Sequence, residues 1–355
     1  MMRHVLKLLV LATAAALALA PLPQRTVEQV YSRGIYPAVQ PRLTWLTNRT
    51  PFAWFDMLLL FGGAAIVGMW VVRLRRGRQR LVRTIGGLTL DTAAAAALVY
   101  LWFLAVWGLN YRREPLSAFL DFREERITRE NLRRLSFRGV ESLNALHKDA
   151  HGRGWPALSE IPDLLAPAFD QAQQELAAPW RAEPGIPKRS LFNFYFTRVS
   201  IDGMTAPFFL ETLANQSLLP YERPATVAHE WAHLAGYADE SEASFVGWLV
   251  CMRGSPSDRY SAWLSLYFTI AQSLPPADRV ELSTALAAGP REDLRAISER
   301  IQRQRVPAAS AAGYAIYDRY LRANRVEAGI RSYGEVIRLL LGTTFDAEGR
   351  VVLKH

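Results

Sequence analysis

The chain has 355 residues, of which 50% are hydrophobic and 21% are charged, and its net charge is +9. This composition excludes a disordered chain, a collagen-like fibre and a small disulfide scaffold. The charge is divided unevenly, because residues 1–113 carry 14 Lys/Arg against 3 Asp/Glu, whereas residues 114–355 carry 28 against 30. Since the second part has a net charge of about −2, it matches a phosphate backbone poorly, and we expect no nucleic-acid partner.

Three apolar segments predict that residues 1–113 form an α-helical membrane anchor. The segments cover about residues 5–23, 54–73 and 85–109. A bilayer core needs about 20 mostly apolar residues per helix, with a range of about 17–25. The second and third segments satisfy this requirement, and the first is marginal. We therefore expect three transmembrane helices, followed by a globular domain over residues 114–355.

The first apolar segment has an alternative interpretation as a cleaved signal peptide. Arg3 and Lys7 provide a basic start, and Ala18-Leu-Ala20 resembles a cleavage site. Pro21 would follow the cut directly, and signal peptidases process such a site poorly. We therefore favour an uncleaved anchor.

Arginines between the second and third apolar segments predict the orientation of the anchor. Residues 73–83 contain six arginines and no acidic residue, and loops of this kind stay in the cytoplasm. Residues 21–53, read as a longer loop with four arginines, are then expected outside. The N-terminus is predicted inside and the globular domain outside. Asp91, near the start of the third segment, is expected to snorkel or to cap rather than to act within the membrane.

Residues 114–355 predict a mainly helical α+β domain with a small sheet. Thr128 is expected to cap the first helix. Further helices are expected over residues 162–176, 224–236, 240–253, 258–274, 290–304, 308–323 and 332–341. Residues 191–197 and 206–211 are rich in aromatic residues and predict two strands.

The motif that indicates a chemical function is His-Glu-Trp-Ala-His at residues 229–233. On a helix, His229 and His233 share one face, so both imidazoles can bind one Zn²⁺. Glu230 beside them can take a proton from water on the metal. Six histidines in a chain of this length would produce the motif by chance only about 0.006 times. The competing interpretation is a pair of core histidines on an apolar helix.

A catalytic zinc needs a third protein ligand, and three acidic residues follow the motif. Asp239 has the spacing of the third ligand in metzincins, whereas Glu240 and Glu242 suit a gluzincin, whose third ligand is a glutamate on the next helix. Asp239 and Glu242 also match a helix capping box, which gives both a structural role. We therefore favour Glu240 as the ligand, with Glu242 and Asp239 as alternates.

A family resemblance supports this choice. The stretch Glu240-Ser-Glu-Ala-Ser244 resembles the Glu-x-x-Ala-Asp/Asn signature of membrane gluzincin metallopeptidases, in which the first glutamate binds zinc. Nearly the whole chain is similar to an uncharacterised family of bacterial membrane proteins with three spans and an external, zincin-like HExxH domain. The matching segments are residues 31–37, 107–113, 206–208, 229–237, 240–245, 317–321 and 332–333. Residues 207–215 depart from the usual strand of that family.

Other residues are weaker candidates for the site. A peptidase needs a group that stabilises the oxyanion, and the candidates are Tyr314, Tyr317, Tyr320 and Tyr333. Tyrosines at helical spacing are more often core residues. Arg322 and Arg331 are expected to be solvated surface residues. Pro207, Phe208 and Glu211 are the candidate substrate-facing edge.

The residues together predict a zinc metallopeptidase in the bacterial cytoplasmic (inner) membrane, with its catalytic domain on the outer side. The expected partners are the lipid bilayer and a peptide or protein of the cell envelope. One alternative is a non-catalytic zinc-binding sensor or scaffold, which the intact Glu230 disfavours. Another is a zinc amidase that acts on peptidoglycan-type amides, which zinc chemistry alone does not distinguish from a peptidase.

Overall fold

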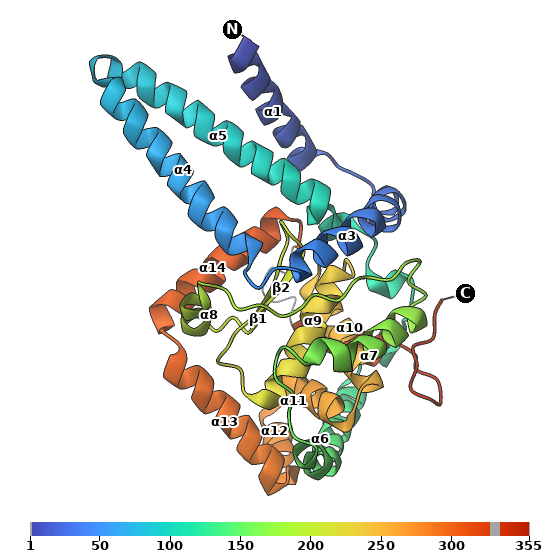
Figure 1. Ribbon diagram of the computed structural model, residues 1–355. Helices are drawn as coiled ribbons and strands as arrows, with labels where there is room; N and C mark the ends of the chain where they lie inside the picture. Colours follow the sequence, from blue (N-terminus) through green and yellow to red (C-terminus); the bar gives the residue numbers. More distant parts are fainter. Residues whose placement is uncertain (1, 327–333, 355) are drawn as a thin grey trace.

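The computed structural model describes residues 2–326 and 334–354. Three long helices project from one end of a larger helical body (Figure 1). They are α1 (Met2–Leu19), α4 (Trp54–Arg76) and α5 (Leu81–Val106). Among the described residues, these three helices are long and apolar enough to cross a membrane, with mean hydropathies of 1.7, 2.0 and 1.7. The predicted fold class, three candidate membrane helices before a mainly helical domain with a small sheet, is confirmed.

Asp91 of α5 joins the three candidate spans. Its carboxylate forms ion pairs with Lys7 of α1 and with Arg73 of α4. An ionised side chain is costly inside a bilayer unless it is paired. The expectation that Asp91 caps a helix is wrong, because the residue lies inside α5 and pairs with two neighbouring helices instead.

The segment between α1 and α4 is helical and is not the predicted loop. It contains α2 (Gln24–Thr26), a π-helical run η1 (Val27–Ile35) and α3 (Tyr36–Asn48). Its buried apolar residues Val27, Tyr31 and Tyr36 are spaced four and five residues apart. This spacing fits the wide turn of a π-helix and escapes a search for the ordinary helical period. The segment packs into the core of the body.

The body is built mainly from helices. They are α6 (Arg129–Gly152), α7 (Ile161–Glu175), α8 (Asn193–Val199), α9 (Arg223–Leu234), α10 (Glu240–Arg253), α11 (Pro256–Ser273), α12 (Pro276–Ala285), α13 (Ala288–Gln304), α14 (Pro307–Ala323) and α15 (Val336–Gly342). Short 3₁₀ turns connect them or follow α4 and α5: η2 (Arg78–Arg80), η3 (Gly108–Arg112), η4 (Leu116–Ala118), η5 (Glu124–Arg126) and η6 (Pro220–Glu222).

Most of the predicted helices of the body are confirmed with shifted ends. Thr128 caps α6 as predicted, since its side chain accepts a hydrogen bond from the Asn131 amide at 3.2 Å. Helix α12 was not predicted, and it begins at Pro276, where a proline fits the first turn. Residues 332 and 333 of the last predicted helix lie outside the described residues.

The sheet consists of two antiparallel strands, β1 (Gly203–Ala206) and β2 (Glu211–Ala214), with Gly203 opposite Ala214. Both strand predictions are wrong. Residues 206–211 mainly form the turn between the strands. Residues 191–197 lie mostly in α8, where the Ser190 hydroxyl accepts a hydrogen bond from the Phe192 amide at 2.9 Å. A local hydrogen bond between a side chain and the backbone favours a turn here over a strand, and β-propensity depends on context.

Helices α9 and α10 lie at the centre of the body (Figure 1). Trp231 of α9, Phe245 of α10 and Tyr260 of α11 are fully buried between the surrounding helices. Cys251 is also buried in this core, as its apolar neighbours in the sequence suggest. The two helices that carry the motif and the acidic residues after it are therefore held rigidly by packing.

Candidate metal centre

Helix α9 carries the His-Glu-Trp-Ala-His motif, as predicted. Pro224 lies in its first turn, where a missing amide proton costs nothing. Gly236 follows its end with a φ of +89°, a conformation that favours glycine. The Gly236 amide donates to the His233 carbonyl at 2.9 Å, so the chain turns sharply into α10.

Three side chains from α9 and α10 converge on one point. The Nε2 atom of His229 lies 3.2 Å from Oε2 of Glu240, and Nε2 of His233 lies 3.4 Å from the same oxygen. Ligands around a tetrahedral zinc lie about 3.3 Å apart, because zinc bonds are about 2.0–2.2 Å long. An ionic hydrogen bond is shorter, about 2.7–2.9 Å. The spacing of the three groups therefore matches the edges of a metal site.

Glu240 offers an oxygen that needs a partner. Its Oε2 atom is buried and lacks a hydrogen-bond donor, and an unsatisfied buried carboxylate oxygen is costly. The other oxygen, Oε1, accepts a hydrogen bond from the Tyr317 hydroxyl of α14. A divalent cation between His229, His233 and Oε2 would satisfy all three groups, so the donor set fits zinc.

The two alternate acidic residues point elsewhere. Asp239 caps α10 and accepts hydrogen bonds from the amides of Ser241 at 2.9 Å and Glu242 at 3.3 Å. Glu242 accepts a hydrogen bond from the Leu116 amide at 2.6 Å. The predicted capping box is therefore wrong for Glu242, although Asp239 is the expected cap. Only Glu240 of the three acidic residues joins the histidines.

The ring of His233 is oriented for metal binding. Its Nδ1 atom lies 2.7 Å from the Tyr237 carbonyl oxygen. Because a carbonyl oxygen only accepts, Nδ1 donates a proton to it, so in the neutral ring the lone pair lies on Nε2 and faces Glu240. The Nδ1 atom of His229 lies 3.3 Å from the Ser244 hydroxyl, which holds the second ring from α10.

The opposite charges of Glu240 and the two histidines stabilise each other. Burial disfavours the ionised form of Glu240, but His233 and His229 outweigh it and hold the pKa of Glu240 well below its ordinary value. Burial likewise opposes a charge on His233, but Glu240 outweighs it and raises the pKa of His233 to about 9. The carboxylate of Glu240 and the charge on the His233 ring therefore stabilise each other.

Glu230 lies beside the convergence point and is 4% exposed. The Thr205 hydroxyl of β1 lies 2.9 Å from Oε2 of Glu230 and positions the carboxylate. Gly203 of the same strand allows this approach, since a Cβ there would lie 2.6 Å from Oε1 of Glu230. Burial raises the pKa of Glu230 above its ordinary value.

Close packing fixes the distance between α9 and α10. A Cβ on Gly247 would lie 2.8 Å from the amide nitrogen and 2.9 Å from the Cα of His229. Because these are backbone atoms, they cannot move aside. Glycine at this position therefore brings Glu240 within reach of the two histidines.

The C-terminal end of α9 is held by the segments that adjoin the membrane helices. Tyr36 of α3 donates a hydrogen bond to the Leu234 carbonyl at 2.8 Å. Trp107, directly after α5, donates to the His233 carbonyl at 3.2 Å. Arg113 donates to the Gly236 carbonyl at 3.1 Å. The C-terminal end of α9 is thus connected directly to the segments next to the candidate membrane helices.

The tyrosine candidates have different positions. Tyr317 contacts Glu240, and Tyr320 stacks on Tyr317 at a centroid distance of 5.8 Å. Tyr314 is exposed. Arg322 pairs with Asp318 on the surface of α14 at 2.8 Å. Tyr333 and Arg331 lie outside the described residues.

The candidate substrate edge contacts the anchor. Pro207 and Phe208 lie in the turn between β1 and β2, and the Phe208 ring stacks on Phe55 of α4 at 6.0 Å. Glu211 is 1% exposed. Its two oxygens accept hydrogen bonds from the amides of Trp54 and Phe55, at 3.0 Å each. Every hydrogen bond described for Glu211 joins it to another residue of the protein.

Several residues of the site were not anticipated from the sequence. Thr205, Gly203 and Gly247 act through contacts between elements far apart in the chain, and no local pattern indicates them. A second group, His147, His151 and Asp293, was also missed. The spacing of its two histidines, four residues apart, was the one available signal.

Comparison with known proteins gives one match. No curated protein and no solved structure matches the chain. A family model described as "Protein of unknown function (DUF3810)" matches residues 31–341. The match covers most of the chain and includes the end of η1, the two strands and every residue of the His229-His233-Glu240 group. The chain therefore belongs to the DUF3810 family, whose function is not known.

Proposed function

We propose that the protein is a membrane-anchored, gluzincin-like zinc metallopeptidase that hydrolyses peptide bonds. His229, His233 and Glu240 hold the metal in this proposal, and Glu230 is the general base. The observation that carries it is the convergence of both imidazoles, at 3.2 and 3.4 Å, on the buried Oε2 atom of Glu240, which has no hydrogen-bond partner among the described residues. Three protein ligands and an open position are typical of catalytic zinc, whereas structural zinc uses four protein ligands.

Zinc, when bound, supplies a Lewis acid that polarises a carbonyl and makes water more acidic. Glu230 takes the proton of the attacking water and later donates it to the leaving amine. Thr205 keeps the carboxylate of Glu230 in place, because its hydroxyl lies within hydrogen-bond distance of Oε2. Tyr317 holds Oε1 of Glu240, which leaves Oε2 directed at the histidines.

The contacts of Trp107 support a site close to the membrane. Candidate span α5 ends at Val106, and the next residue, Trp107, contacts both the carbonyl and the ring of His233. The arginine-rich connection between α4 and α5 supports an N-terminus in the cytoplasm. We therefore propose that the domain lies outside the bacterial inner membrane and acts on a peptide or protein of the cell envelope near the bilayer.

The proposal is tested with full-length, zinc-loaded protein in lipid nanodiscs. One sample receives a library of envelope-protein peptides, and another receives muropeptides. Mass spectrometry then identifies new amino termini. We expect cleavage of peptides, loss of cleavage with a chelator, and recovery when zinc is restored.

Other outcomes identify the alternatives. Cleavage restricted to muropeptides would contradict a peptidase and support a zinc amidase. Absence of any cleavage, with zinc bound and both substrate classes present, would contradict an enzyme and support a sensor or scaffold.

A further inference from the structure

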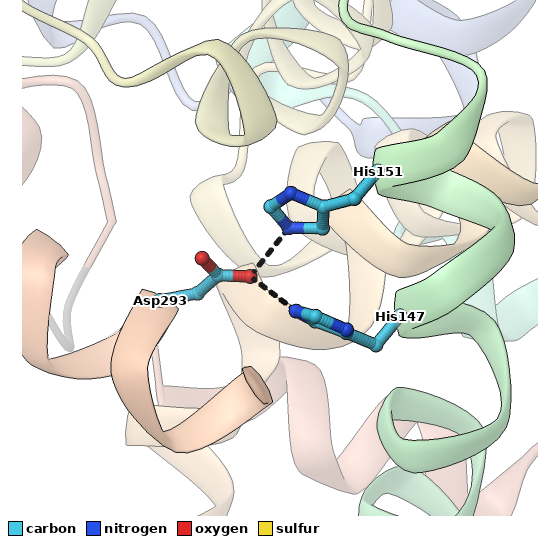
Figure 2. Close-up of side chains that lie close together, drawn as sticks. All are labelled: His147, His151 and Asp293. Carbon is cyan, nitrogen blue, oxygen red and sulfur yellow. Dashed lines mark hydrogen bonds and ion pairs between the residues drawn. The ribbon is translucent and has the colours of Figure 1, made fainter. Parts of the chain in front are cut away.

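A second group of metal-ligand residues lies between α6 and α13. His147 and His151 lie one turn apart on α6, and both rings point toward the same carboxylate oxygen of Asp293 on α13 (Figure 2). The Nε2 atom of His151 lies 2.8 Å from Oδ2 of Asp293, and Nε2 of His147 lies 3.7 Å from it. The centroids of the two imidazole rings are 4.4 Å apart. One atom from each of the three residues lies within 4.8 Å of the others.

The carboxylate of Asp293 is sheltered, whereas the rings reach solvent. Its side chain is 10% exposed, against 29% for His147 and 34% for His151. Tyr260 of α11 donates a hydrogen bond to Oδ2 at 2.6 Å, and Tyr221 donates to the backbone carbonyl of Asp293 at 3.3 Å. Hydrogen bonds of this kind orient a carboxylate that binds a metal. An ion can therefore enter from solvent to a carboxylate that is already positioned.

Hydrogen bonding alone accounts for only part of this arrangement. His151 is within hydrogen-bond distance of Asp293, but His147 is not, although its ring faces the same oxygen. Gly289 of α13 makes room for the His147 ring, since a Cβ there would lie 2.3 Å from its Cε1 atom. Two imidazoles and one carboxylate suit zinc and similar transition metals, whereas Mg²⁺ and Ca²⁺ prefer oxygen ligands.

We propose that His147, His151 and Asp293 form a second site, which binds a divalent transition metal and joins α13 to α6. The site has its own residues and does not depend on the proposed peptidase activity. It lies toward the start of α9, because Ser261, next to Tyr260, accepts a hydrogen bond from the Ala225 amide at 3.0 Å. His233 of the first site lies at the other end of that helix.

Metal binding at the second site can stabilise the first site through the short connection between α13 and α14. Only residues 305–306 separate α13 from α14, and α14 supplies Tyr317, which contacts Glu240. A metal that fixes α13 against α6 would therefore restrict the movement of α14. Its main role in this proposal is structural.

The test uses tag-free, full-length protein in detergent, so that no added histidines bind metal. The His229→Ala/His233→Ala variant is saturated with Zn²⁺ and freed of excess by gel filtration, and its zinc is measured by elemental analysis. We expect about one zinc per chain from the second site. Adding His147→Ala and His151→Ala is expected to remove it, whereas Lys148→Ala, an exposed neighbour on α6, is expected to retain it.

A second pair of variants distinguishes loss of the metal site from loss of folding. Asp293→Asn keeps an oxygen for Tyr260, and His147→Ala/His151→Ala is also examined with the first site intact. Each is expected to hold one zinc per chain fewer than the wild type and to lose part of the rise in thermal midpoint that zinc produces. The proposal is overturned if the His229→Ala/His233→Ala protein holds no zinc, or if removal of His147 and His151 leaves its zinc content unchanged.

Discussion

Glu230→Gln is expected to abolish peptide hydrolysis while zinc remains bound. Glutamine has the same shape and keeps a partner for the Thr205 hydroxyl, but it cannot accept a proton from water. A general base contributes about 10²–10⁴-fold to the rate, so kcat is expected to fall by at least about 100-fold. Thr205→Val keeps the carboxylate and loses only the hydroxyl that contacts it and the Glu230 carbonyl, so a smaller fall is expected.

Steady-state kinetics and elemental analysis on the same preparations test this prediction. The zinc content of Glu230→Gln is expected to equal that of the wild type, because the three ligands are intact. Near-normal kcat in this variant would exclude Glu230 as the base. Loss of zinc together with activity would show that Glu230 supports the metal instead.

Lys188→Met is expected to lower the free energy of unfolding by about 3–5 kcal/mol. Lys188 and Glu211 form a buried ion pair at 2.8 Å, with side chains that are 4% and 0% exposed. Lys188 also donates to the carbonyls of Thr47 at 2.6 Å and Phe52 at 3.2 Å. Its removal leaves a charged carboxylate and these carbonyls with fewer donors in a region closed to water.

Denaturant unfolding of the full-length protein in detergent measures the effect. Arg189→Met is the matched control, because Arg189 is the exposed neighbour of Lys188, and its effect is expected to stay within about 0.5 kcal/mol. The double variant Lys188→Met/Glu211→Gln is expected to be more stable than Lys188→Met, since no buried charge is left alone. Equal stability of Lys188→Met and the wild type would contradict the proposed importance of this pair.

The parts of the structure that were predictable depend on short-range geometry. His229 and His233 share a face because any helix places residues four apart on the same side. The three spans follow from the length of the apolar runs. Asp239 could be recognised as a helix cap, and this reasoning favoured Glu240, which does join the histidines.

The parts that were missed depend on contacts between distant residues. Glu242 bonds to Leu116, which is 126 residues away in the chain, so its predicted capping role was wrong. Asp293 meets His151 across 142 residues. The strand predicted at residues 191–197 failed because an aromatic, β-prone sequence also forms a helix when local hydrogen bonds and packing favour one.

The most direct test of the account is the zinc content of tag-free, full-length protein beside its His229→Ala/His233→Ala variant. Both proteins are saturated with zinc, separated from excess metal and compared by circular dichroism to establish that they are folded. We predict that the variant holds one zinc per chain fewer than the wild type, because it loses two of the three ligands of the proposed site. Equal zinc contents in the two folded proteins would contradict it.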